Sequence, residues 1–148
     1  MRRISFLALI VGGAVSFFSS IILSIPVGAI FALKMAAAHR LADPNAARAF
    51  AIGDPLYYYG VLTAEFLCCM AGGFLAGVTA RHDEALNGLL SALFMVAIEA
   101  GFAAMDPHPL PVKILRAFGY LAASALGGYL RAVQVRRRIN ATVVATTQ

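Results

Sequence analysis

Two glutamates inside long apolar segments are the residues of this sequence best suited to carry chemistry. Glu65 lies in the apolar run 56–80, and Glu99 lies in the run 85–105. An unpaired ionised side chain deep in a bilayer is costly, so such residues usually face a partner or a wet cavity. A carboxylate in that setting can bind and release a proton, and a proton-coupled carrier requires this chemistry.

Arg116 is the expected partner of Glu99. The proline-rich segment 106–111 separates the apolar runs that contain them, and the two residues lie at similar distances in sequence from His108. In an antiparallel pair of helices they reach a similar depth, where they can form a buried ion pair with a purely structural role. Lys113 is a further cation close to this level. These residues define a candidate intramembrane charge site.

Glu65 is open to two interpretations. Counting from Pro55 places it about 15 Å along its helix, near the expected level of Glu99. In one interpretation the two carboxylates share a region with Arg116, and one of them exchanges a proton. In the other, Glu65 is protonated and hydrogen-bonded to a serine such as Ser20 or Ser24, which is a structural role.

Other chemistries lack their sequence signatures. The three histidines fall in polar segments, so no pair of them can ligate a haem between facing membrane helices. The chain has no His-x-x-x-His pair, no glycine-rich phosphate loop before a lysine and no Gly-x-Ser-x-Gly elbow. Cys68 and Cys69 are neighbours that cannot easily form a disulfide, so we interpret them as packing residues. We therefore expect no catalytic residues, no cofactor and no metal site.

The composition predicts that the candidate site lies among membrane-spanning helices. Of 148 residues, 61% are hydrophobic and 13% are charged, whereas a soluble domain carries about a quarter charged residues. A helix needs about 20 apolar residues to cross the hydrocarbon. We predict one all-α domain, 1–148, folded as an antiparallel bundle of four transmembrane helices. The expected spans are 4–33, 56–80, 85–105 and 112–133, with an outer loop at 34–55 and a basic cytoplasmic tail at 134–148.

Local signals set the expected ends and bends of these helices. Asp54 followed by Pro55 is an N-cap followed by proline at the first helical position. Asp83 is the expected cap of the third span. Pro26 removes a backbone donor within the first span and is expected to kink it. The segment 140–148 is short, polar and β-branched, so we expect it to fray.

Aromatic and basic residues indicate where the chain meets the membrane surface. The inner segments carry seven basic residues and the outer ones five, which favours both termini on the cytoplasmic side of a bacterial inner membrane. The net charge of +5 reflects arginines beside a span, so we expect contact with lipid and no binding of nucleic acid. The expected interface residues are Tyr57, Tyr58, Tyr59, Arg136, Arg137 and Arg138.

Small residues recur at four-residue spacing in three of the expected spans. They are Gly12, Ser16, Ser20, Ser24 and Gly28 in the first, Gly73 and Gly77 in the second, and Gly119, Ala123 and Gly127 in the fourth. In lipid, such rows let helices approach closely, inside one chain or between chains.

The small-residue rows favour a noncatalytic protein that packs as a structural or accessory subunit of a membrane complex or homo-oligomer. The alternative is a small proton- or ion-coupled transporter or channel subunit that uses Glu65 and Glu99.

Overall fold

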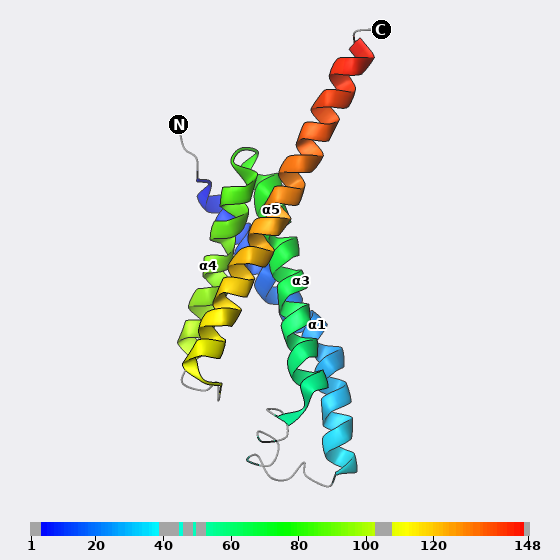
Figure 1. The fold of residues 1–148 in the computed structure, drawn as a ribbon, viewed down its shortest axis with the longest axis vertical. Coiled ribbons are helices and arrows are strands. Elements are labelled where there is room, and N and C mark those ends of the chain that lie inside the picture. Colours follow the sequence, from blue (N-terminus) through cyan, green and yellow to red (C-terminus); the bar gives the residue numbers. More distant parts are fainter. Residues whose placement is uncertain (1–3, 39–44, 46–48, 50–52, 103–107, 147–148) are drawn as a thin grey trace.

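The computed structural model is built from long helices (Figure 1). It describes residues 4–38, 45, 49, 53–102 and 108–146. The long helices are α1 (Phe6–Ala37), α3 (Pro55–Ala80), α4 (Glu84–Phe102) and α5 (Leu110–Thr146). This confirms the prediction of an all-helical protein with four long helices.

Three of these helices are long and apolar enough to cross a membrane. They are α1, α3 and α4, which correspond to the first three predicted spans. The chain is therefore a multi-pass helical membrane protein. The predicted third span extended to residue 105, but residues 103–105 lie outside the described part of the chain.

The start of α3 follows from its capping sequence. The Asp54 carboxylate accepts hydrogen bonds from the backbone N–H groups of Leu56 (2.9 Å) and Tyr57 (3.2 Å), and Pro55 opens the helix. These contacts satisfy donors that the first helical turn leaves without partners. The predicted N-cap is confirmed.

A tight turn joins α3 to α4. Arg81 and Asp83 adopt left-handed backbone conformations there, with φ of 59° and 44°. Asp83 precedes α4 as expected, and its backbone carbonyl accepts from the Asn87 N–H (3.0 Å). The Asn87 side chain also ties this turn to the start of α1, because its Oδ1 accepts from the Ser5 N–H (2.9 Å) while its Nδ2 donates to the His82 carbonyl (3.1 Å).

The helices pack in an open arrangement with α3 and α4 at its centre. Both α1 and α5 pack against α3 and α4, but within the described residues α1 and α5 do not pack against each other. Figure 1 shows α1 and α3 diverging from α4 and α5 toward the end of the bundle where α3 and α5 begin. We call this the open end, and the end that carries the α3–α4 turn the closed end.

Small residues allow the helices to approach at the closed end. A methyl group on Gly127 of α5 would lie 1.9 Å from the Met70 carbonyl oxygen of α3. One on Gly73 of α3 would lie 2.0 Å from the Ser124 carbonyl oxygen of α5. The buried Ser124 hydroxyl also donates to the Gly88 carbonyl of α4 (2.7 Å). Glycine is therefore required for the contact between α3 and α5.

The last part of α5 differs from the prediction. We expected residues after Asn140 to fray, but α5 continues as a helix to Thr146. No proline or glycine follows Gly128, and the Thr142 hydroxyl bonds to the Arg138 carbonyl one turn earlier (3.0 Å). The helix thus continues past Asn140, so the expected fraying from that residue is wrong.

Pro26 lies within α1, which continues through it as one helix of 32 residues. Its side chain is exposed on the outer surface of the helix.

Candidate functional site

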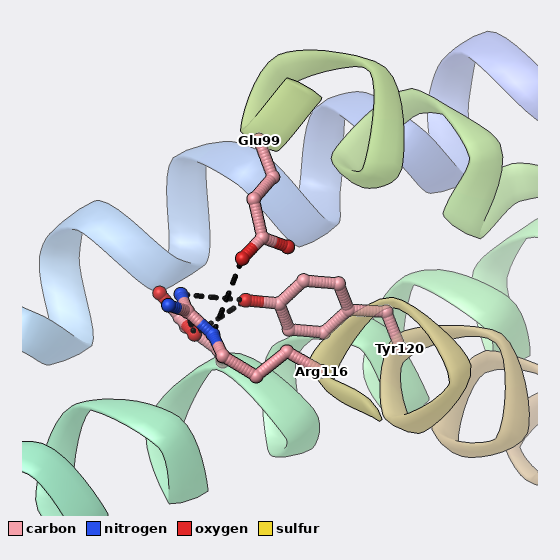
Figure 2. A network of polar contacts seen from close by, with 4 residues as sticks. Glu99, Arg116 and Tyr120 are labelled. Carbon is pink, nitrogen blue, oxygen red and sulfur yellow. Dashed lines mark hydrogen bonds and ion pairs between the residues drawn. The ribbon is translucent and has the colours of Figure 1, made fainter. Parts of the chain in front are cut away.

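Arg116 of α5 stands at the centre of a group of polar side chains from three helices. Its Nε lies 3.2 Å from Glu99 Oε1 of α4, and its Nη2 lies 3.5 Å from Glu65 Oε2 of α3. Figure 2 shows the Glu99 carboxylate and the Arg116 guanidinium directed toward each other. The structure thus brings the two glutamates together around one cation. We call the group of Glu65, Glu99, Arg116 and Tyr120 the carboxylate–arginine cluster.

Tyr120 completes the cluster. Its hydroxyl donates to Glu65 Oε2 (2.7 Å) and accepts from Arg116 Nη2 (3.1 Å). The short contact to Glu65 is of the charge-assisted kind, which is stronger than a bond between neutral groups. Tyr120 is only 2% exposed, and its ring packs edge-on against Phe66. This packing orients the hydroxyl toward Glu65.

Sequence reasoning missed Tyr120, although a signal for it exists. Arg116 and Tyr120 are four residues apart on α5, so they lie on the same face of the helix, one turn apart. The serines considered as partners of Glu65 bond elsewhere, because the hydroxyls of Ser20 and Ser24 donate to carbonyls of their own helix (2.8 Å each). Tyr120 takes the role that was proposed for a serine.

The cluster borders a cavity of about 350 Å³ between the helices. Glu65, Glu99, Arg116 and Tyr120 form its polar wall, and side chains of α1 and α4 supply most of the rest. The side chains of the two glutamates and Arg116 are 16–19% exposed. The charged groups are therefore mostly enclosed by the helices but remain in contact with the cavity.

A second cavity, of about 140 Å³, leads from the cluster toward the open end. Glu65 and Arg116 line both cavities. Tyr58 and His108 line the second one, with ring centroids 5.0 Å apart. The ion pair between Glu65 and Arg116 therefore borders both hollow regions.

The depth of the cluster follows from its positions along the helices. At a rise of about 1.5 Å per residue, Glu65 lies about 15 Å from the start of α3 and Arg116 about 9 Å from the start of α5. Glu99 lies about 5 Å before Phe102, the last residue of α4. All three belong to the half of the bundle nearer the open end, where the helices diverge.

The remaining residues of the predicted charge site and membrane interface lie near the ends of the bundle. Lys113 is half-buried on the first turn of α5 and lines neither cavity at the cluster. Tyr57, Tyr58 and Tyr59 lie in the first two turns of α3. Arg136, Arg137 and Arg138 are exposed on the part of α5 that extends beyond the closed end (Figure 1).

The rows of small residues divide between internal contacts and open positions. Gly12, Ser16 and Ser20 are buried in α1, whereas nothing lies within 4 Å of a methyl group placed on Gly28. Ser24 is intermediate in exposure. The glycines of α3 and α5 all have close neighbours: Ser124 lies next to Gly73, Glu84 and Arg131 next to Gly77, Phe66 next to Gly119, and Met70 next to Gly127. Ala123 packs against the central hydrophobic core.

An ion pair joins α1 and α3 at the open end of the bundle. Lys34 Nζ lies 2.6 Å from Asp54 Oδ2. The hydrogen bond from Lys34 lowers the pKa of Asp54 below its ordinary value of 3.8, and the N–H groups of Tyr57 and Leu56 act in the same direction. Asp54 thus caps α3 and also binds the end of α1.

The cluster thus combines two carboxylates, one guanidinium and one phenol in the wall of a cavity. Among the described residues, no group of three or more His, Cys, Asp and Glu side chains could hold a metal ion. Comparison of the chain with models of protein families, with curated proteins and with solved structures finds no match.

Proposed function

We propose that this chain is a proton-coupled carrier of a small cation, which acts in a bacterial inner membrane. One observation carries the proposal: two carboxylates from neighbouring helices contact the same guanidinium in the wall of a cavity of about 350 Å³. Acidic groups within spans commonly mark proton relays and ion pathways. The same carboxylates can therefore hold a proton or a cation in turn.

The proposal includes α5 as a fourth span. This helix packs along α3 and α4, which are both long and apolar enough to span. Its charged Arg116 contacts Glu65 and Glu99 instead of lipid. These contacts reduce the cost of placing a charged side chain within the membrane. With four spans, both termini lie on the same side, which the arginines after Tyr129 favour as the cytoplasm.

The proposed exchange rests on competition for the two carboxylates. Protonation of Glu65 removes its charge and weakens its attraction to Arg116. The Glu65 contact is also the longer of the two ion pairs, 3.5 Å against 3.2 Å for Glu99. Separation of Glu65 from Arg116 joins the two cavities, and a cation that enters then replaces the proton.

The test measures proton release in proteoliposomes that contain the full chain and the pH dye pyranine. Sodium, potassium, guanidinium and benzyltrimethylammonium chlorides are added singly to the outside. We expect at least one cation to drive proton release from the vesicles, and Glu65→Gln to abolish it. Glu84→Gln, which removes a carboxylate at the closed end of the bundle, is the matched control and should retain the signal.

Two results would refute the proposal. Equal proton release by Glu65→Gln and the unmodified chain would remove Glu65 from the exchange. Absence of release with all four cations, in vesicles shown by protease protection to hold inserted protein, would exclude proton-coupled cation transport.

A second candidate function is that of a structural or accessory subunit in a membrane complex or homo-oligomer. It is favoured by the part of the α1 row beyond Ser20, where a methyl group on Gly28 meets nothing within 4 Å. The neighbouring Ile25 and Ile30 are also exposed, by 62% and 50%. This face of α1 is open to lipid or to a second helix.

In-membrane crosslinking separates this candidate from the carrier. A cysteine introduced at Ser24 should crosslink to a partner in native membranes, and Gly28→Leu should abolish the product if the α1 row is an interface. A crosslinking pattern unaffected by Gly28→Leu would count against an accessory role through this face.

A further inference from the structure

The apolar residues that line the cavity indicate the class of ligand, in addition to the charged residues. The lining also includes Phe17 of α1 and Met95, Ile98 and Phe102 of α4. These side chains offer apolar and aromatic surface within the same space as the two carboxylates. A hydrated inorganic ion gains nothing from such walls, whereas an amphipathic ligand buries its apolar part against them.

We propose that the cavity binds an organic monocation that carries an aromatic or apolar group. The proposal deepens the proposed function, on which it rests, by naming its substrate class. The cationic part lies at Glu65 and Glu99, and the apolar part lies against Phe17 and Phe102. Aromatic faces also attract cations, most strongly where water is excluded.

Charge and size both agree with this class. Among the residues that line the cavity, two carboxylates accompany one guanidinium, so the lining attracts cations and repels anions. Pockets for small organic ligands have volumes of about 300–1,000 Å³, and a cavity of about 350 Å³ lies at the lower end of that range. The ligand is therefore small, with roughly one ring.

One aromatic residue of the cavity lining is strongly exposed. Phe102, the last residue of α4, lines the cavity and is 60% exposed. It lies at the open end, where α4 diverges from α1 and α3 (Figure 1). An amphipathic cation that collects at the membrane surface can thus contact Phe102 before it reaches the carboxylates.

Calorimetric titration of the purified full chain in detergent tests the proposal. The probe is benzyltrimethylammonium, with benzyl alcohol as a neutral aromatic ligand and phenylacetate as an anionic one. We expect saturable binding of the cation only. Glu99→Gln should weaken it by about tenfold or more, since a charged contact in a partly buried site is replaced by a neutral one, and Glu84→Gln on the same helix should leave it unchanged.

A second pair of variants tests the aromatic wall without disturbing the ion pairs. Phe102→Ala should weaken binding of benzyltrimethylammonium severalfold and have little effect on tetramethylammonium, which lacks the ring. Phe118→Ala is the matched control, because Phe118 is similarly exposed (64%) but lines neither cavity at the cluster. Both side chains are exposed, so we expect both variants to fold.

The outcomes separate this inference from the proposed function. Equal binding of cation and benzyl alcohol, or binding unaffected by both Glu99→Gln and Phe102→Ala, overturns the ligand class. Proton release driven by sodium or potassium together with no organic-cation binding also overturns it, while the carrier function stands. Glutamate-dependent binding of benzyltrimethylammonium without any proton release supports the ligand class and refutes coupled transport.

Discussion

The contact between α3 and α5 predicts that two identical Gly→Ala changes have opposite effects on stability. In Gly127→Ala the new methyl group would lie 1.9 Å from the Met70 carbonyl oxygen and 2.8 Å from the Phe74 amide nitrogen. Ordinary contact begins near 3.4 Å, so the helices must separate by about 1.5 Å. In Gly28→Ala on α1 the methyl group meets nothing within 4 Å.

The magnitude follows from two opposing effects. Alanine favours a helix over glycine by up to about 1 kcal/mol, and this gain is common to both variants. Only Gly127→Ala adds strain, which in packed cores costs about 1–3 kcal/mol. Both opposing atoms belong to the backbone of α3 and cannot rotate away. We therefore expect a strain energy of about 3 kcal/mol in Gly127→Ala.

Unfolding in mixed micelles, followed by circular dichroism while the fraction of denaturing detergent is raised, measures this difference. Gly127→Ala should lower the free energy of unfolding by about 2 kcal/mol, and Gly28→Ala should leave it unchanged or raise it by up to about 1 kcal/mol. Equal transitions for the two variants would refute the close approach of α3 and α5 as the reason for glycine at position 127.

Three further perturbations probe other contacts by the same unfolding measurement. Tyr120→Phe removes the hydroxyl that bonds to Glu65 at 2.7 Å and should cost about 1.5–3 kcal/mol; a smaller loss than that of an exposed Tyr→Phe control would count against the bond. Asn87→Leu removes the amide that joins α1 to the α3–α4 turn and should cost about 1–3 kcal/mol, whereas an unchanged stability would contradict that role. The contact of Asp54 with Lys34 lowers the Asp54 pKa, so the stability that ionised Asp54 contributes is complete above about pH 3.8 and is lost as the pH falls through the lowered pKa. The difference in unfolding free energy between the unmodified chain and Asp54→Asn should therefore shrink on acidification. A difference that does not change with pH would contradict this role of Asp54.

Charge and helix ends were the features most accessible from the sequence. Asp54 caps α3 because its side chain and the following proline act on adjacent residues. The proximity of Glu99 and Arg116 followed from their matched distances to the turn between the helices. The contact of Glu65 with Arg116 depends on how α3 packs against α5, and no local signal in the sequence specifies that packing.

The end of α5 and the role of Tyr120 were not predicted correctly from the sequence. Fraying after Asn140 was inferred from composition, but this segment lacks the proline and glycine that end helices, and α5 continues to Thr146. Tyr120 was overlooked because tyrosine was considered only as a marker of the membrane surface. Its position one turn after Arg116 becomes informative once Arg116 is known to face inward.

The sequence by itself determined the all-helical class and the three apolar helices that qualify as spans. These properties depend on composition, run length and capping, all of which act over a few neighbouring residues. The tertiary structure alone decided that Glu65 and Tyr120 join Glu99 at Arg116, and that the α1 row is covered at Gly12 yet open at Gly28. Those outcomes depend on the rotation of each helix and its choice of neighbour, because a row of small residues reads the same in one dimension whether it meets its own chain, another chain or lipid.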